Sequence, residues 1–574
     1  MQSPSDPWAT VEPDRHVLAV VRSVPVAGRL LDVAGLLADD RVGLTYTVTP
    51  GSVSESGVVP ALRAAGVERI LPWEEAVERS SGFDLALAAS TKGGLHRLET
   101  RLVLMPHGAG HNRRVGSAPG SLTHASGLDA AELLHGGEPI ASRFLFSHSE
   151  QSARLDAALP SARGRGVVVG DPAHDRMLAA LGRRDRYRDA LDLRGRRLVV
   201  VSSTWNRGSL LGSRRALIRE LLARLPHDEY RVALVAHPNV HRHHDPSQLE
   251  LWFVDEVEAG LALIPDAEGW RAALIAADVV VGDQGSVTYY AAALRRPVLL
   301  AAFETGDLDP DSPLLEFGGR LPRIDGGEDL AAQVDRAART PPAPVADLLI
   351  EHPGGSAARV RSVLYDLLDL PEDRLGPARY RSLPDLPDRP EDVTAWRVDA
   401  RTDGDARVVD LRRRPASAPG SAGPERAAVL PLVVDAEDTA MPHWAAADAW
   451  SHRRPRPGRG AAAWSADRLE AYPKAVVAAA AASGPGGNGV LVLHRSGGAM
   501  LVRTPLDEDS GWYSAPEAGG PDASLVASAA VAWARAGLPW RAWHDRVRLV
   551  VGEREVLVEA TPPPPDFGFS QALV

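Results

Sequence analysis

Residues 278–297, DVVVGDQGSVTYYAAALRRP, contain the clearest structural signal in the chain. An apolar run is followed by a turn that contains Gly282 and Gly285, and then by a stretch of helical character that ends before Pro297. This order predicts one βα unit of a parallel sheet. Such a turn brings the free amides of a helix N-terminus and the hydroxyl of Ser286 to the sheet edge, an arrangement suited to a phosphate or diphosphate.

Short apolar runs alternate with helical patterns through much of the chain. From Val17 to about residue 150 they are VLAVV, GLTYTV, DLALAA, RLVLM and FLFSHS; from about residue 166 they are GVVVG, RLVVVSS, RVALVAH, DVVVG and PVLLAAF. The alternation predicts an α/β protein with two consecutive Rossmann-like domains, residues 1–160 and 161–383. Because open parallel sheets bind ligands at the carboxyl ends of their strands, we expect the chemistry in a cleft between these domains.

The pattern changes after residue 383. Residues 384–426 are rich in Pro, Arg, Asp, Ala and Ser and include RRRPASAPGSAGPER, which has no apolar periodicity, so we expect a linker. Beyond it, LEAYPKAVVAAAAAS and SLVASAAVAWARAG are expected to be helical, and VLVLHRSGGAMLVRT and RVRLVVGEREVLVEA to be hairpins. Residues 427–574 are therefore predicted to form a small α+β domain, to which no motif assigns a role.

Composition excludes several classes of function. A net charge of −11 without a dominant basic block argues against binding of duplex nucleic acid. The chain has no cysteine, which excludes disulfides, thiolate metal sites and cysteine nucleophiles. The first residues, MQSPSDPWATVEPDRH, lack the basic and then apolar run of a signal peptide, and no stretch reaches the roughly 18 apolar residues of a membrane span. We therefore expect a cytoplasmic protein.

Two histidines stand where predicted strands end. RLVLM runs directly into Pro106, His107 and Gly108, and RVALVAHP brings His237 to the same kind of edge. A single histidine in such a place often only makes a hydrogen bond within a turn. Because these two would come from facing domains, they predict a cleft lined by two imidazoles, with His107 as candidate general base and His111 as the nearest replacement.

A second polar turn, Ser202 to Arg207, follows the run RLVVV. Thr204 supplies a hydroxyl group there, and Arg207 either neutralises phosphate oxygens or is an ordinary surface arginine. With the glycine-containing turn, the candidates for contact with a donor phosphate are Thr204, Arg207, Asp283, Gly285 and Ser286.

Two further clusters have alternative interpretations. The run HPNVHRHHD contains His241, His243, His244 and Asp245, which are ligand types that suit zinc, but their close spacing along one segment favours a solvated loop without metal. The run RRDRYRDALDLRGRR carries seven arginines and is either attracted to anionic lipid or paired with acidic neighbours. Peripheral contact with the inner face of a membrane therefore stays an open alternative.

Taken in order, these segments resemble the CDP-glycerol glycerophosphotransferase family of teichoic acid synthesis. The matching segments are HG after the strand RLVLM, GDPAHDRM with YRDAL, SSTWNR, AHP, and DQGS followed by LRRPVL, over roughly residues 100 to 305. The resemblance implies a GT-B arrangement, with the acceptor domain first and the nucleotide-donor domain second. It also implies that His107 and His237 are the catalytic histidines of the His-Gly and His-Pro motifs, and that Ser286 and Thr204 contact the donor phosphates.

The chain departs from the family pattern at several positions. The family has Asp-Tyr-Ser-Ser where this chain has Asp283, Gln284, Gly285 and Ser286, so one hydroxyl group is missing from the expected phosphate site. A lysine usually follows His-Gly, where this chain offers Arg113 and its neighbour Arg114. We assign Arg113 to the acceptor side. The long carboxyl-terminal addition also lies outside the family pattern.

The preferred hypothesis is phosphoryl transfer. A hydroxyl group of a glycan or polyol-phosphate acceptor attacks the phosphorus next to the glycerol of CDP-glycerol, or of a related CDP-polyol, with His107 as base and CMP as leaving group. The scheme requires no metal and no other cofactor, and no nucleic-acid partner is expected. Two alternatives remain: a GT-B glycosyltransferase that uses a nucleotide-sugar, and a non-catalytic protein that binds nucleotides or glycans.

Overall fold

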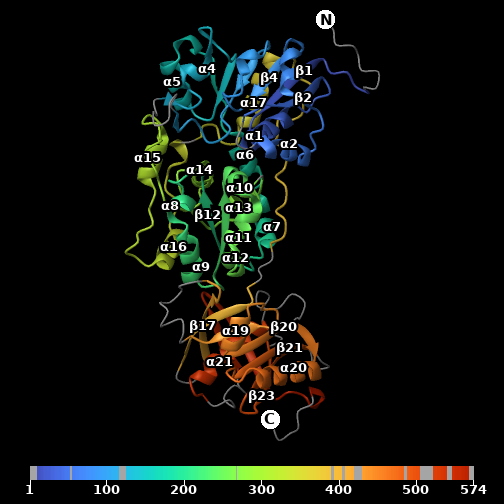
Figure 1. Ribbon diagram of the computed structural model, residues 1–574, viewed down its shortest axis with the longest axis vertical. Helices are drawn as coiled ribbons and strands as arrows, with labels where there is room; N and C mark the ends of the chain where they lie inside the picture. The colour runs from blue at the N-terminus through green and yellow to red at the C-terminus, as the bar shows by residue number, and fades with distance from the viewer. Residues whose placement is uncertain are drawn as a thin grey trace.

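The chain folds into three bodies in a row, two α/β domains followed by a β-barrel (Figure 1). The computed structural model describes residues 10–51, 55–115, 124–266, 268–348, 350–389, 393–403, 407–418, 430–483, 488–504, 521–538 and 546–567. The two α/β domains confirm the predicted fold class for the first two thirds of the chain, and the barrel corrects it for the remainder.

The first domain is built on a seven-stranded parallel sheet. Its strands are β1 (Arg15–Val21), β2 (Val42–Val48), β3 (Ile70–Leu71), β4 (Leu85–Ala88), β5 (Leu102–Leu104), β10 (Arg143–Phe146) and β11 (Gly166–Val168). They lie in the order β11-β10-β5-β4-β1-β2-β3. The strands are nearly continuous apolar runs because helices cover both faces of the sheet. Two small antiparallel ribbons are added, from β6 (Arg114–Val115) and β7 (His124–Ala125), and from β8 (Leu134–His135) and β9 (Glu138–Pro139).

The boundary between the two α/β domains differs from the predicted residue 160. β11 pairs with β10 and is the edge strand of the first sheet, although its sequence was expected to open the second domain. A helix from the other side of the predicted boundary, α17 (Ser356–Leu367), also returns to this domain, where Val360 and Leu364 join its apolar core. The other helices of the domain are α1 (Val24–Ala34), α2 (Glu55–Ala64), α3 (Trp73–Glu78), α4 (Ala130–Leu133) and α5 (Ser149–Ala158).

The second domain has a five-stranded parallel sheet. Its strands are β12 (Arg197–Ser203), β13 (Tyr230–Ala236), β14 (Ala262–Leu263), β15 (Val279–Gly282) and β16 (Val298–Leu300), in the order β14-β13-β12-β15-β16. Its helices are α6 (Pro172–Ala179), α7 (Arg184–Ala190), α8 (Leu210–Arg214), α9 (Ala216–Arg224), α10 (Pro238–His244), α11 (Pro246–Trp252), α12 (Val254–Glu258), α13 (Gly269–Ala276), α14 (Ser286–Ala293), α15 (Pro313–Arg320) and α16 (Leu330–Arg339). The strand order reverses between β12 and β15, the position where open α/β sheets bind ligands.

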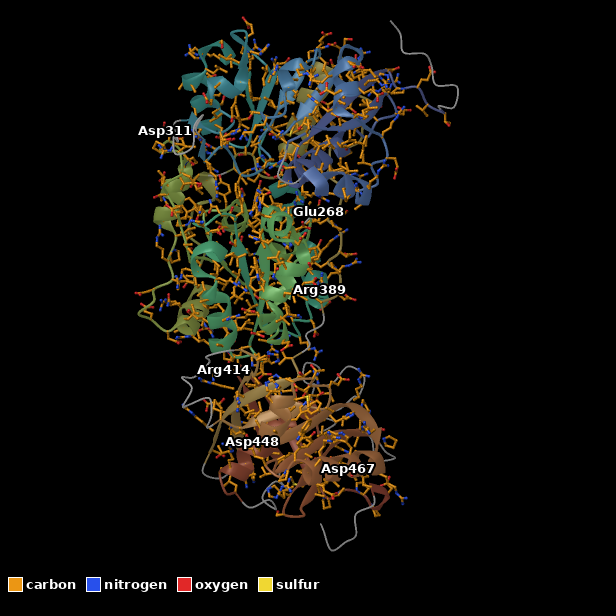
Figure 2. The ribbon with its side chains drawn as sticks, viewed as in Figure 1. Glu268, Asp311, Arg389, Arg414, Asp448 and Asp467 are labelled. Carbon is orange, nitrogen blue, oxygen red and sulfur yellow. The ribbon has the colours of Figure 1, made fainter. Side chains whose placement is uncertain are left out.

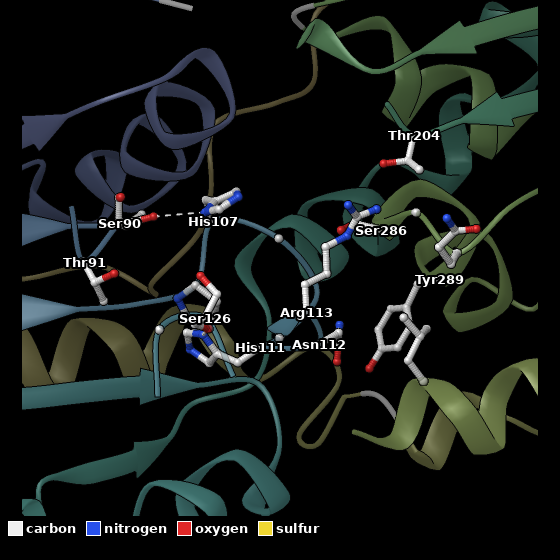
Figure 3. Close-up of a pocket in the computed structure, with 18 of the residues that line it drawn as sticks. Ser90, Thr91, His107, His111, Asn112, Arg113, Ser126, Thr204, Ser286 and Tyr289 are labelled. Carbon is white, nitrogen blue, oxygen red and sulfur yellow. Dashed lines mark hydrogen bonds between the residues drawn. The ribbon is translucent and has the colours of Figure 1, made fainter. Parts of the chain in front are cut away.

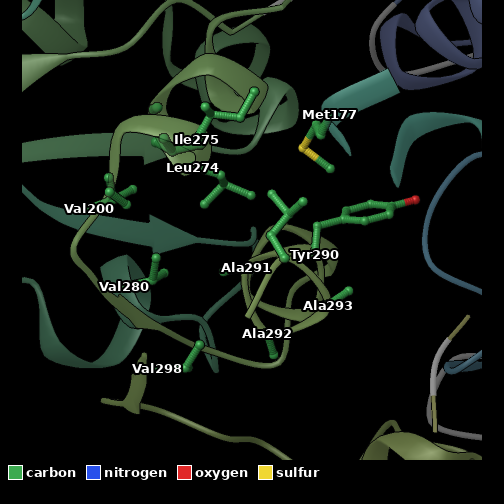
Figure 4. Packing of buried hydrophobic residues seen from close by; sticks show 14 of the residues in the cluster. Met177, Val200, Leu274, Ile275, Val280, Tyr290, Ala291, Ala292, Ala293 and Val298 are labelled. Carbon is green, nitrogen blue, oxygen red and sulfur yellow. The ribbon is translucent and has the colours of Figure 1, made fainter. Parts of the chain in front are cut away.

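One apolar cluster holds α14 against this sheet (Figure 4). Val200 and Val280 from the strands meet Ala291 of α14 and Leu274 of α13, all of them buried. The alanines of α14 allow the helix to approach the sheet closely. Tyr290 packs its ring in the same cluster, and its hydroxyl group points out of it (Figure 4). The core therefore fixes the position of the turn that precedes α14.

Two predictions about charged segments have different outcomes. The histidine run after β13, expected to be a solvated loop, forms the short helix α10 because Pro238 begins it and the side chain of His237 caps it. The arginines around α7 are paired, as one of the two interpretations expected: Arg184 and Arg188 with Asp278, Arg186 with Asp385, Arg194 with Asp192, and Arg197 with Asp335. Membrane contact stays an untested prediction. Within the described ranges, no helix is both long and apolar enough to span a bilayer.

The third body is a closed barrel, which the prediction of a small α+β domain did not include. Its order is β17-β18-β24-β25-β23-β22-β21-β20-β19, with β19 pairing back to β17. The strands are β17 (Ala395–Thr402), β18 (Val408–Pro415), β19 (Leu432–Asp435), β20 (Ala449–Pro457), β21 (Val477–Ser483), β22 (Gly489–His494), β23 (Ala499–Arg503), β24 (Arg546–Val551) and β25 (Arg554–Thr561), and the helices α19 (Met441–Ala446), α20 (Gly458–Ala471) and α21 (Ala523–Arg535). Both predicted hairpins and the buried helix α21 are confirmed.

Two local predictions in this region are wrong. The alanine-rich segment expected to continue a helix forms β21, because pairing with β20 and β22 in the barrel wall overrides the helix propensity of alanine. The expected linker 384–426 contains β17 and β18. In β18 the inward positions are Val409, Leu411 and Arg413. Because one of them is an arginine, the sequence does not show the alternation of apolar and polar residues that is typical of a strand. The part of the expected linker from residue 419 to 426 lies outside the described residues.

The barrel docks on the second domain at the edge where the strands begin. Arg413 forms a buried ion pair with Asp228, at 3.0 Å between Nε and Oδ2, just before β13. Arg197, the first residue of β12, contacts Glu553 at 2.8 Å. Figure 2 labels Arg414 near this junction, and Glu268 at the opposite end of the second domain, beside the first domain. The barrel therefore lies at the opposite end of the second sheet from the strand ends that face the first domain.

Candidate active site

The facing edges of the two sheets enclose two adjoining cavities. The larger measures about 540 Å³ and the smaller about 130 Å³. Six residues line both and form the passage between them: His107, Gly108, Thr204, His237, Gly285 and Ser286. Figure 3 shows the larger cavity, with His107 on the side of the first domain and Thr204 and Ser286 on the side of the second. Five of the eight residues predicted for the site therefore meet at one place.

The ring of His107 presents an unprotonated nitrogen to the cleft. Its Nδ1 lies 3.2 Å from the carbonyl oxygen of Ala89, dashed in Figure 3, and a carbonyl can only accept, so Nδ1 carries the proton. The ring is open to the cavities but lies deep between the domains, and this burial is the main cause that lowers its pKa. The charge of Arg29 lowers the pKa further, against the opposing effect of the Ala89 carbonyl. A neutral imidazole with a free Nε2 suits a general base.

His237 has the opposite arrangement. Its Nδ1 accepts a hydrogen bond of 3.1 Å from the backbone amide of Asn239, so the proton of the neutral ring lies on Nε2. Burial lowers the pKa of His237 to about 3, with further lowering from His107 and Arg113. Such an imidazole can act either as a charged group or as a neutral hydrogen-bond donor. In the folded chain it is a neutral donor near neutral pH.

The N-terminus of α14 is open toward the passage. Gly285 is the residue before the helix, and no side chain caps it. A Cβ atom at position 285 would lie 3.0 Å from both Thr204 and Asp283, so this close approach favours glycine. The amides of the first turn of α14 and the exposed hydroxyl of Ser286 are then available to an anion.

Asp283 does not have the predicted role. It is fully buried and lines neither cavity. Its carboxylate accepts hydrogen bonds of 2.9 Å from the backbone amides of Thr204, Leu210 and Gly285. Burial raises the pKa of Asp283, against the effect of these three donors. Asp283 therefore lies outside both cavities. Its carboxylate holds the turn after β12, which contains Thr204, against the turn before α14, which contains Gly285.

Arg207 also differs from its prediction. Thr204 lines both cavities, but the side chain of Arg207 is exposed and lines neither of them. The turn instead presents Trp205 and Asn206 to the larger cavity. Trp205 is 44% exposed. The centre of its ring lies 6.4 Å from the centre of the His237 ring and 5.9 Å from the guanidinium of Arg113. Sequence reasoning named the turn correctly but could not give the direction of each side chain.

The larger cavity has a polar wall from the first domain. Arg113 lies there, as predicted for the acceptor side, and forms an ion pair of 3.2 Å with Asp307 of the second domain. Ser90, Thr91 and Lys92 were not predicted. They directly follow the buried end of β4, so the rule that identified His107 could also have found them. His111 lines this cavity too, and burial lowers its pKa to about 4.

The smaller cavity combines flat apolar and polar groups. Trp270 and Pro265 line it beside Asp266, and Val24 and Pro25 of the first domain complete the wall. None of these residues was predicted. Val24 and Pro25 lie in the first turn of α1 and Trp270 in the first turn of α13, and no sequence motif marks them or the loop of Pro265 and Asp266. Planar, mostly apolar surroundings with a few polar groups are typical of sites for a nucleoside.

Among the described residues, no group of three or more histidine, aspartate or glutamate side chains is placed to hold a metal ion. His243 and His244 of α10 line neither cavity.

These features define a protein with two facing Rossmann-type domains and one site in the cleft between them, the GT-B arrangement. No family model matches the sequence, and no curated protein matches it. The structure is similar to the wall teichoic acid polymerase TagF soaked with CDPG, with 12% identity over 62% of this chain and 89% of that one and a TM-score of 0.45. It is also similar to S. aureus MnaA with UDP, at 11% identity over 64% and 100% of the two chains and a TM-score of 0.41. A third similar structure is the UDP-GlcNAc 2-epimerase of Neisseria meningitidis bound to UDP-GlcNAc, at 11% identity over 62% and 99% and a TM-score of 0.39.

Proposed function

We propose that the protein is a transferase that uses a nucleotide-diphosphate donor, and that the donor is CDP-glycerol or a related CDP-polyol. The observation that carries the proposal is the pairing of His107 and His237 in one passage, one with a free acceptor nitrogen and the other with a free donor. A protein that only binds nucleotides has no need of a neutral base beside the phosphate site. The resemblance of the motifs over roughly residues 100 to 305 supports the cytidine nucleotide and the polyol.

The donor is proposed to bind from the smaller cavity toward the passage. Its base and ribose occupy the space beside Trp270 and Asp266, and its diphosphate lies at the N-terminus of α14, near Ser286 and Thr204. The acceptor, a polyol phosphate or a glycan, enters through the larger cavity, where Lys92 and Arg113 supply positive charge. The two substrates then meet at His107.

The proposed reaction is an in-line displacement at phosphorus. His107 Nε2 takes the proton of the acceptor hydroxyl as the new oxygen–phosphorus bond forms, and the bond from that phosphorus to the bridging oxygen breaks. CMP leaves with the electron pair of that bond. The amides of α14 and the Nε2–H group of His237 stabilise the negative charge on the leaving phosphate.

The test is incubation with a panel of CDP- and UDP-activated donors in the presence of polyol-phosphate and glycan acceptors, with release of CMP or UDP followed by chromatography. Release of CMP that depends on the acceptor and is lost in His107→Ala is expected. Release of UDP from a nucleotide-sugar would replace the proposal with a glycosyltransferase of the same fold. Nucleotide binding without any release would establish the non-catalytic alternative.

A further inference from the structure

A buried group of side chains lies directly behind the His107–Gly108 turn. Arg29 of α1 is 3% exposed and Asp171, which precedes α6, is 1% exposed. Their side chains meet at 2.9 Å between Nη2 and Oδ2. The hydroxyl of Tyr290 in α14 accepts from Arg29 at 3.0 Å and donates to Asp171 at 2.9 Å. The guanidinium also reaches the carbonyl oxygen of Gly108, at 3.5 Å.

Each member of the group comes from a different part of the cleft. Arg29 belongs to the first domain, Asp171 caps the helix α6 at the crossover between the domains, and Tyr290 lies one helical turn after Ser286 in the second. Burial alone would lower the pKa of Arg29, but Asp171 and Tyr290 raise it above its ordinary value, so the guanidinium stays charged. A fixed positive charge therefore lies behind the ring of His107.

A second layer holds this arrangement in place. Asp32, one turn after Arg29, accepts from Arg176 at 2.6 Å and from Arg271 at 2.8 Å. Arg271 also pairs with Glu268 at 2.7 Å. These contacts join α1 and α6, which also carry Arg29 and Asp171, to α13. Because all of them are buried or half-buried, the group is rigid when the two domains are together.

We propose that Arg29 is a positioning residue, which with Asp171 and Tyr290 fixes the His107–Gly108 turn against the donor domain and holds a positive charge behind the His107 ring. The assignment of a base rests on the proposed function, but the effect on the ring does not. Arg29 and Tyr290 also line the smaller cavity, but the role proposed for Arg29 is exerted through the turn and not through contact with a substrate. The proposal gives a role to a buried network that the reaction itself does not use.

The other groups near the ring are consistent with this role. The titratable or charged side chains that face His107 or its turn are Arg29, Asp171 and Tyr290 from behind, and His111, Arg113 and His237 from the cleft. His111 and His237 are themselves neutral near pH 7, because burial lowers the pKa of both. Arg113 is paired with Asp307. Arg29 is thus the cation whose removal is expected to act most directly on the ring.

The test uses the full chain with ¹³C-labelled histidine. The imidazole of His107 is assigned by its absence in His107→Ala, and its titration is followed by NMR in the parent and in Arg29→Gln. The protonation of His107 is expected to move to higher pH, since a cation that opposes it has been removed. The variant Arg29→Gln with Asp171→Asn removes the buried pair together and answers the same question if the single change prevents folding.

Kinetics separate charge from position. In Arg29→Gln the acid limb of kcat/KM, where the base becomes protonated, is expected to shift to higher pH. Tyr290→Phe leaves the charge of Arg29 in place, so the acid limb of kcat/KM should stay at the same pH. In this variant kcat is expected to fall about tenfold, because the His107–Gly108 turn is held less precisely. Tyr365→Phe is the matched control, since its buried hydroxyl bonds to Asp39 at 3.1 Å in the first domain, away from the cleft, and activity should be unchanged.

The outcomes are distinguishable. If the titration of His107 is the same in Arg29→Gln and in the double variant as in the parent, the inference is wrong whatever the activity. If the titration moves but no donor is turned over by the parent, the proposed transferase fails and the electrostatic role of Arg29 stands.

Discussion

Gly108 and Ser286 touch across the cleft: a Cβ atom on Gly108 would lie 2.9 Å from the hydroxyl oxygen of Ser286. The two residues come from different domains, the first directly after the candidate base and the second at the start of α14. Their contact brings the candidate base and the phosphate site together at one point. Several expected results depend on this closeness.

The variant Gly108→Ala is expected to displace the Ser286 hydroxyl without unfolding the chain, because a hydroxyl group can rotate away from a new methyl group. Nucleotide affinity should fall about tenfold, the value of one hydrogen bond to a charged group, with little change in Tm. Combining it with Ser286→Ala should add nothing further, since both changes remove the same hydroxyl group. Gly82→Ala, where nothing lies within 4 Å, is the matched control. Additive losses in the double variant would place the effect elsewhere.

The two catalytic candidates should separate in steady-state kinetics. His107→Ala is expected to lower kcat roughly a hundredfold or more while nucleotide binding by calorimetry is retained, as for a group that acts in the transition state. His237→Ala should weaken both, because its Nε2–H group faces the bound phosphate as well. His243→Ala is the control, because His243 lies in α10, the helix that His237 caps, but lines neither cavity. An active His107→Ala enzyme would move the base to another residue, with His111 the nearest.

Stability should fall on mild acidification. The folded pKa values of His237 and His111, about 3 and about 4, lie below the ordinary value of 6.5. Below pH 6.5 the unfolded chain therefore binds protons that the folded chain does not. The free energy of unfolding decreases as the pH falls from 6.5 toward the pKa values of the folded chain. Tm measured from about pH 7.5 to about pH 5 should drop less steeply in His237→Gln than in the parent. Parallel curves would show that His237 is not buried in solution as it is here.

The junction between the barrel and the second domain should depend on one buried pair. Asp228→Asn removes the buried ion-pair partner of the Arg413 guanidinium, which is 5% exposed, and is expected to cost about 3–5 kcal/mol in chemical denaturation. Glu553→Gln removes a surface partner of Arg197 and Arg339 and should have a much smaller effect, because exposed ion pairs contribute little to stability. Proteolysis should then cut faster between the bodies in Asp228→Asn alone. Equal effects of the two changes would contradict a junction held mainly by Arg413.

The α/β domains could be predicted because each strand is a local apolar run followed by a turn and a helix. The barrel could not be predicted, because some of its strands lack the alternation of apolar and polar residues by which a strand is recognised. β21 is almost entirely alanine, which by itself favours a helix, and β18 places Arg413 at an inward position. Only the neighbouring strands and Asp228, contributed by another domain, make these segments strands.

The site was predictable to the extent that strand ends identify it. His107, His237, Thr204, Gly285 and Ser286 follow strands and meet at the passage. Side-chain direction was not predictable: Asp283 and Arg207 were expected to contact the donor phosphates, but their side chains line neither cavity. The Arg29 network was beyond reach for another reason: Arg29 and Tyr290 are separated by 261 residues, and no local pattern records such a contact.

The docking of the barrel has a practical consequence for measurement. It is attached where β12 and β13 begin, and each strand has seven residues, so roughly 23 Å of sheet separates it from the substrates. A dye, bead or surface linked to the barrel would leave both entrances to the cleft free. The barrel can thus serve as a handle by which single molecules are held while binding in the cleft is recorded.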